Sequence, residues 1–219
     1  MSDNNILIKR FERSNRKAVR LISCDTAFLG IDNKLFFDDD EVLADALTIY
    51  YTDYEPQSCF VAVEKNKVIG YIIGSKNVVR MDMIFHYIIL PKLIIKALAR
   101  GVFLRKKNIR FLLRVAGSFL KGEFSTPDFS KQYPATLHIN IDENFRGRKI
   151  GNQLIEHYLK YLKENKIGGV HFGTMSGRAK NFFTRLGFNI LFETRHSYLT
   201  YITKQDIHYY ILGKTFKTL

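Results

Sequence analysis

The chain has 219 residues, 46% of them hydrophobic, with 14 glycines and 4 prolines. This composition is ordinary for a globular protein that buries a core, and no repeat or low-complexity tract indicates a fibrous or disordered chain. Lys and Arg number 34 against 21 Asp and Glu, a formal net charge of +13. The two cysteines, Cys24 and Cys59, lack the spacing of a metal site, and the first ten residues lack the apolar run of a signal peptide. We therefore expect a reduced, cytoplasmic protein without a metal site.

The first fifty residues predict one strand and two helices. The strand covers residues 6–10, and Ser14 is the expected cap of a helix that runs to about Phe28. Acidic residues 38–41 open the second helix, because carboxylates stabilise the positive end of a helix dipole; a metal site is the less favoured alternative. The expected inner faces of the two helices consist of Ala18, Leu21 and Ile22, and of Val42, Leu43, Ala46 and Leu47.

A hairpin follows a turn at residues 53–57. Its strands cover residues 59–63 and 68–74, with the reversal about residues 65–67. Asp53 and Glu55, in the turn, could bind a cationic ligand, although an exposed turn before a strand is the simpler interpretation.

Residues 75–134 carry most of the excess charge. Between residues 75 and 121 there are eleven Lys and Arg and one acid, Asp82, so this stretch contributes +10. It predicts a helix over residues 83–99, with a possible fresh start at Pro91, and a basic amphipathic helix over residues 108–120. Its longest uncharged run, residues 83–91, is too short to span a membrane.

A strand, a turn and a helix follow from Pro134. Apolar and polar residues alternate over residues 136–141, and apolar residues then recur at spacings of three and four from Ile150 to about Lys166. The turn between them is basic and rich in glycine. Free N–H groups and cations at a helix start suit a phosphate or a diphosphate, whereas the alternative is a basic helix start on a solvated surface.

The last fifty residues predict a strand at 169–173, a helix at 177–185 and strands at 188–194 and 207–214. The whole is a mixed α/β fold in which helices cover a mostly antiparallel sheet.

Two motifs resemble the GNAT acyltransferases. Arg146-Gly-Arg-Lys-Ile-Gly151 is similar to motif A, with Lys149 in place of the first glycine of the signature. Ala179-Lys-Asn-Phe-Phe-Thr-Arg-Leu-Gly-Phe188 is similar to motif B. The resemblance implies one GNAT-like domain over residues 1–219, with a basic helical insertion at about 75–134 between the third and fourth strands.

The resemblance also implies that acetyl-CoA is the cosubstrate and lies across splayed fourth and fifth strands. It assigns the pyrophosphate to the turn, the pantetheine arm to the fourth strand, and the thioester region to motif B. The cofactor-binding residues expected on this basis are Ile139, Ile141, Arg146, Gly147, Arg148, Lys149, Ile150, Gly151 and Phe183.

Two positions depart from the family pattern. Phe183 stands where the family commonly has a tyrosine that protonates the departing thiolate, and Ser176 stands where it often has asparagine. Candidate substitute donors are Ser176, a water molecule or a tyrosine from residues 50–54. His138 and His171 are candidate bases because a histidine accepts a proton near neutral pH, although a strand histidine more often makes only a structural hydrogen bond. The catalytic residues expected are thus His138 and Ser176.

The leading hypothesis is an acetyl-CoA-dependent N-acetyltransferase acting on a small-molecule or peptide amine. Acidic acceptors are expected if the basic segment steers the substrate; otherwise that segment serves packing or a homodimer contact. One alternative is a CoA-binding sensor or scaffold that has lost transfer. Another is a protein that binds an anionic membrane or nucleic acid, and apolar residues among the cations favour peripheral membrane contact over nucleic acid.

Overall fold

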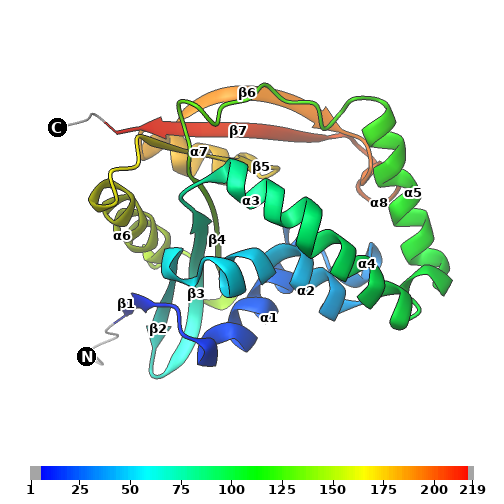
Figure 1. The fold of residues 1–219 in the computed structure, drawn as a ribbon, viewed down its shortest axis with the longest axis horizontal. Helices are drawn as coiled ribbons and strands as arrows, with labels where there is room; N and C mark the ends of the chain where they lie inside the picture. Colours follow the sequence, from blue (N-terminus) through cyan, green and yellow to red (C-terminus); the bar gives the residue numbers. More distant parts are fainter. Residues whose placement is uncertain (1–5, 217–219) are drawn as a thin grey trace.

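The seven strands of the computed structural model form two separate antiparallel sheets (Figure 1). The structure describes residues 6–216, so part of the N-terminal stretch considered for a signal peptide lies outside it. The four-stranded sheet has the order β1-β2-β3-β4, and the three-stranded sheet has the order β5-β7-β6. The strands are β1 Leu7–Arg10, β2 Cys59–Glu64, β3 Lys67–Ser75, β4 Thr136–Ile141, β5 Gly169–Thr174, β6 Asn189–His196 and β7 Ile207–Thr215.

The described part of the chain contains eight α-helices. Short π-helical turns continue α2 and join α3 to α4. The helices are α1 Arg16–Thr26, α2 Asp40–Ile49, α3 Val78–Ile84, α4 Leu90–Ala99, α5 Lys106–Leu120, α6 Ile150–Glu164, α7 Gly177–Arg185 and α8 Thr200–Thr203. None of the described helices is long and apolar enough to cross a membrane. The mixed α/β class with antiparallel sheets is therefore confirmed.

The main core lies between both sheets and the two helices α6 and α7. Alternation along β4 points Leu137 and Ile139 towards α6, and along β7 it points Tyr210 and Leu212 into the same cluster as Phe183 of α7. We call this side the first face. It buries the apolar stripe of α6 that the sequence predicted.

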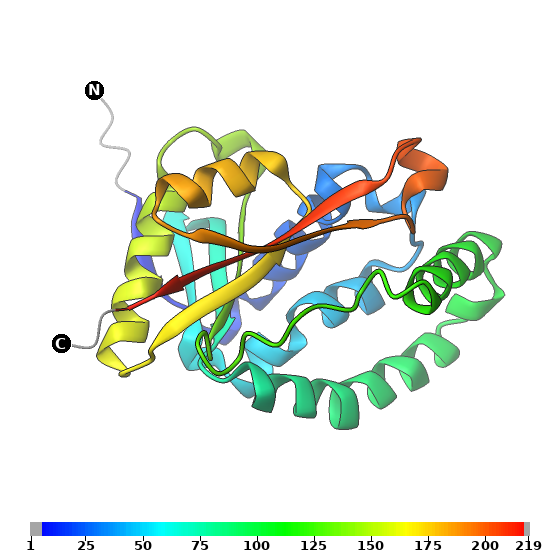
Figure 2. The ribbon, with the colours of Figure 1, turned by 90° about the horizontal axis from the view of Figure 1, so that it is seen from above.

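The second face of the sheets is covered by α1 and by the segment from α3 to β4. Val19 and Ile22 of α1 pack on Tyr71 and Ile73 of β3. The chain after α5 returns to β4 as an extended segment beside the β5-β7-β6 sheet (Figure 2). Rings of Phe124 and His196 lie 4.8 Å apart along this path.

Local predictions in the N-terminal half were right about the elements and wrong about several side chains. Lys65 and Asn66 both have positive φ at the β2–β3 reversal, as a tight hairpin requires. Ser14 does not cap α1, whose N-cap is Asn15. Leu21 and Ala46 are exposed, because the inward turns of α1 and α2 bury other residues, including Asp45.

Candidate functional site

The two sheets separate between β4 and β5. A single parallel bridge joins Ala135 to Val170, with hydrogen bonds of 3.1 Å from Ala135 N–H to Gly169 O and 2.9 Å from His171 N–H to Ala135 O. Beyond this bridge β4 and β5 do not pair: β5 pairs with β7 along its whole length on its other edge, and β4 is the edge strand of its own sheet. The polar backbone edge of β4 is therefore free of a neighbouring strand in the described structure, next to the turn that begins α6.

The start of α6 is built from two left-handed backbone positions. Gly147 has φ 84°, and Lys149, the N-cap residue, has φ 60° and ψ 12°. Lys149 occupies the place of the signature glycine, and its conformation shows why glycine is favoured there: a side chain in this region costs about 1 kcal/mol. No side chain caps this helix start. Its first N–H groups are consequently open to a ligand at the positive end of the helix.

The three cations of this turn have different surroundings. Arg146 and Lys149 are exposed, and neither makes an ion pair within the described residues. Arg148 is committed elsewhere: its guanidinium forms two hydrogen bonds to Glu64 of β2, one of 3.2 Å, and lies 5.5 Å from the centre of the Phe145 ring. Two of the three cations of this turn are therefore exposed and without an ion pair in the described structure.

Close packing fixes the first turn of α6. A Cβ added to Gly151 would lie 3.2 Å from the Phe182 ring and 3.4 Å from Ile141, so any larger residue would crowd α7. Ile150 is buried in the main core. Phe182, which the sequence analysis did not select, thus lies against the helix start, and its place in motif B was the available signal.

Phe183 does not line the open region. Its side chain is 3% exposed and packs between Phe172 and Phe188, with ring centres 4.4 and 5.2 Å away. The expectation that Phe183 contacts the thioester is therefore not supported by the geometry: its ring fills the core between α7 and β5.

His138 lies on the second face of β4 in a chain of polar contacts. Asn140 Nδ2 lies 2.9 Å from His138 Nε2 and donates a 2.7 Å hydrogen bond to the Tyr71 hydroxyl. Desolvation lowers the pKa of His138 to about 4. The ring is therefore neutral at pH 7, with its Nε2 accepting from Asn140, and it is a weak base in this state.

Ser176 lies directly after β5 and caps α7. Its hydroxyl accepts a 3.2 Å hydrogen bond from Ala179 N–H, which leaves the hydroxyl proton free to donate. The other candidate, His171, lies on the second face of β5. Its Nδ1 is 2.7 Å from Tyr133 O, and burial lowers its pKa.

The acids and tyrosines of residues 50–55 are structural. Glu55 is buried and accepts hydrogen bonds from Tyr50, Ser58 and Ser75 at 2.6–2.9 Å. Asp53 pairs with Arg16 at 3.0 Å. These groups hold α2 against β3, and neither acid is available to a cationic ligand.

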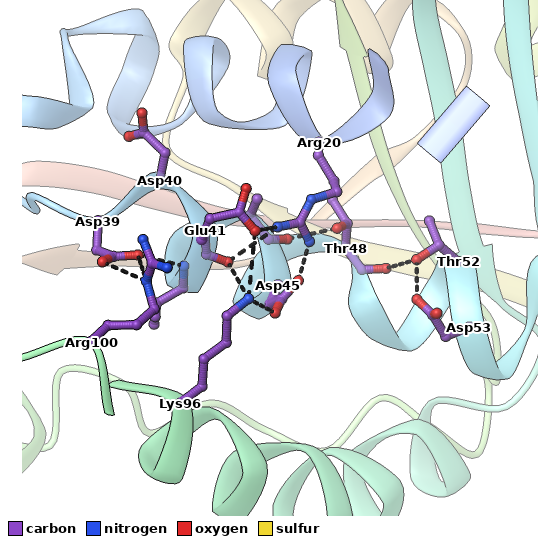
Figure 3. A network of polar contacts seen from close by, with 12 residues as sticks. Arg20, Asp39, Asp40, Glu41, Asp45, Thr48, Thr52, Asp53, Lys96 and Arg100 are labelled. Atoms are coloured by element: carbon purple, nitrogen blue, oxygen red, sulfur yellow. Dashed lines mark hydrogen bonds and ion pairs between the residues drawn. The ribbon is translucent and has the colours of Figure 1, made fainter. Parts of the chain in front are cut away.

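The acidic start of α2 receives the cations of the segment between β3 and β4 (Figure 3). Asp39 caps α2 by accepting a 3.0 Å hydrogen bond from Val42 N–H, and Arg100 donates to it at 2.8 and 2.9 Å. Lys96 bonds to Asp45 at 2.6 Å, and Arg20 of α1 bonds to the same carboxylate. Lys96 and Arg100 thus hold α4 against α2, so these two cations are not available to an acidic acceptor.

A hollow of about 490 Å³ opens on the second face, between α3 and residues 126–130. Its lining includes His171 of β5 and two carboxylates, Asp82 and Asp128. Asp82 is the one acid of the basic stretch, and partial burial raises its pKa.

Residues 115–188 match the model of the acetyltransferase (GNAT) family. A search of the curated proteins found no match to the chain. Among solved structures the chain is similar to SsHAT, with a TM-score of 0.68 and 23% identity over 96% of this chain and 98% of that one.

Two further structures extend the likeness. A polyamine N-acetyltransferase of Drosophila melanogaster, which forms N-acetylagmatine, has a TM-score of 0.59 and 12% identity over 97% of this chain and 100% of that one. The ribosomal-protein-S18-alanine N-acetyltransferase of Escherichia coli has a TM-score of 0.55 and 13% identity, over 98% of this chain and 96% of that one. At these identities the likeness concerns the fold.

Proposed function

Since residues 115–188 carry the acetyltransferase (GNAT) family segment, we propose that this protein transfers the acetyl group of acetyl-CoA to an amine. One observation carries the proposal: the sheets part beside a helix start that has no side-chain cap, two left-handed residues and two unpaired cations. That arrangement fits a diphosphate, because backbone N–H groups and cations converge there with little side-chain bulk.

We assign a role to each group at the divide, the place where the two sheets separate between β4 and β5. Arg146, Gly147 and Lys149 hold the diphosphate with the first N–H groups of α6, whereas Arg148 supports the turn through Glu64. The free backbone edge of β4 at Ile139 and Ile141 pairs with the amides of the pantetheine arm. Holding both reactants at the divide converts a bimolecular reaction into one within a complex.

The chemical step needs few protein groups. The amine nitrogen bonds to the thioester carbonyl carbon, the carbon–sulfur bond breaks, and the thiolate leaves while the amine proton passes to water. We assign Ser176, whose hydroxyl proton is free, the hydrogen bond to the leaving sulfur. A free thiol has a pKa of about 8.5, so departure does not require the tyrosine that Phe183 replaces.

The acceptor is proposed to be a cationic amine that enters from the second face. The carboxylates of Asp82 and Asp128 in the hollow beside β5 are the observation in favour. Similar folds are found in a polyamine N-acetyltransferase, an agmatine N-acetyltransferase and a ribosomal-protein-S18-alanine N-acetyltransferase, whose names indicate amine acceptors.

Thiol release tests the proposal. Purified protein is incubated with acetyl-CoA and, separately, with spermidine, agmatine, an alanine-terminated peptide and glutamate, and free thiol is measured against an amine-free control. We expect release with at least one cationic amine and less with glutamate. Tight binding of CoA in calorimetry with no amine-dependent thiol release would instead support the second candidate, a CoA sensor, which Phe183 favours.

A further inference from the structure

Helix α5 packs Phe111 against Phe28 and Phe37 but presents several of its other apolar residues to solvent. Its buried residues are two polar ones: Asn108 is 0% exposed and bonds to Asp38 N–H at 2.7 Å and Val102 O at 3.1 Å, and Ser118 is 1% exposed and lies 3.2 Å from Ser197. Leu113 and Leu120, by contrast, are 66% and 86% exposed. The apolar stripe of α5 is therefore not accounted for by the core.

The neighbouring helices also have exposed apolar residues. Helix α4 buries Leu93 and Ala97 against α2 and leaves its other side open. The exposed large hydrophobic residues between β3 and β4 include Met83, Tyr87, Ile95, Leu98, Leu104, Ile109, Leu113, Phe119 and Leu120. So many exposed apolar side chains on one segment exceed the scattered residues of an ordinary surface and indicate an interaction site.

Cations without acidic partners lie among these residues. No acid occurs from Met83 to Gly122, and Lys92, Lys106 and Arg110 are exposed with no ion pair in the described structure. Apolar side chains flanked by free Lys and Arg are typical of helices that lie in the interface of an anionic bilayer.

Charge also decides between possible occupants of this surface. A symmetric contact between two copies would bring each acid-free segment against the other, so that cations meet cations. A nucleic acid would match the charge but offers no partner to Leu113 or Leu120. An anionic lipid surface satisfies both the cations and the apolar residues.

We propose that α3, α4 and α5 form a peripheral membrane-binding surface that docks on anionic lipid. The exposed apolar residues enter the headgroup region, and the free Lys and Arg contact the lipid phosphates. This proposal does not depend on the binding of CoA, because it involves neither the α6 turn nor the separation of the two sheets; Met83 and Tyr87 do also line the hollow proposed for the acceptor.

Vesicle co-sedimentation of the full chain tests the proposal. The vesicles are phosphatidylcholine alone and phosphatidylcholine with about one third phosphatidylserine. We expect binding to the mixed vesicles at least tenfold stronger than to the neutral ones, with a decrease as salt rises. The double variant Leu113→Glu/Leu120→Glu should bind the mixed vesicles at least tenfold more weakly than the wild type, and Lys106→Gln/Arg110→Gln should bind them severalfold more weakly.

A matched control comes from α1. Leu21 is 61% exposed on another part of the surface, so Leu21→Glu should bind vesicles within twofold of the wild type. Circular dichroism spectra equal to that of the wild type would show that the variants are folded, so that differences in binding come from the changed surface residues. Absence of binding to mixed vesicles overturns the proposal. It is also overturned if light scattering shows a dimer that Leu113→Glu/Leu120→Glu dissociates, or if RNA binds more tightly than the vesicles and the leucine variant leaves that binding unchanged.

Discussion

The starts of α2 and α6 are both charged helix N-termini, and they have opposite designs. At α2 the Asp39 carboxylate caps the helix and also accepts hydrogen bonds from Arg100. Its oxygens therefore have partners inside the protein. At α6 the N-cap residue is Lys149, which offers no cap and has an unfavourable backbone conformation. A helix start that is satisfied internally serves the fold, whereas one left open at a cost in stability is available to a ligand.

Breaking the closed start should have the largest effect. The side chain of Asp39 is 1% exposed. Asp39→Ala removes the cap of α2 and leaves Arg100 without its carboxylate partner. We expect a loss of about 2–3 kcal/mol in the free energy of unfolding, measured in urea at pH 7. Asp38→Ala, at the exposed neighbour, should change it by less than about 0.5 kcal/mol. Equal effects of the two variants would contradict the assignment of Asp39.

An effect of intermediate size is the pH dependence of the free energy of unfolding, which we expect from His138 on β4, the strand before the start of α6. The pKa of His138 is lowered to about 4 in the fold from an ordinary value near 6.5, so the unfolded chain binds more protons between these values. Stability therefore falls as pH decreases through this window, by about 2 kcal/mol between pH 8 and pH 5 from this group.

Urea titrations of wild type and His138→Gln at pH 8, 6.5 and 5 measure this effect. The variant should lose less stability on acidification than the wild type. Asn189→Gln, at an exposed position of β6 without a titratable side chain, is the control and should follow the wild type. Parallel pH profiles for wild type and His138→Gln would show that this ring is not held neutral.

The smallest expected effect is an increase in stability on substitution of Lys149, at the start of α6. Lys149→Gly removes the side chain from a left-handed position, and we expect the free energy of unfolding to rise by about 1 kcal/mol. Lys149→Ala keeps a Cβ in the same conformation and should gain little. If alanine stabilises as much as glycine, the lysine side chain and not its backbone conformation is the source of the cost.

The comparison also marks what sequence alone could predict. Periodicity located β4 and α6 within a residue or two, because each has a regular apolar pattern that packs in the main core. On α2 it placed Val42 and Leu43 on the inner face correctly but missed Asp45, which is buried where Arg20 and Lys96, distant in sequence, meet at its carboxylate. Long-range pairing of this kind has no local pattern.

The same limit applies to the site. The turn at residues 146–151 was identifiable from its residues and from the motif, but the diversion of Arg148 to Glu64 and the burial of Phe183 depend on contacts across the fold. Likewise the basic segment could be recognised as amphipathic. Which of its cations are paired with α2, and which of its leucines face solvent, became clear only in three dimensions.

The central claim is that the open start of α6 holds the diphosphate of CoA. It is tested most directly by titrating wild type and Lys149→Glu with CoA and with pantetheine, which lacks the phosphates, and following binding by NMR. We predict that the charge reversal weakens CoA about fivefold, a little under 1 kcal/mol, and leaves pantetheine within twofold. Equal affinity of both proteins for CoA, or an equal loss for CoA and pantetheine, would contradict the claim.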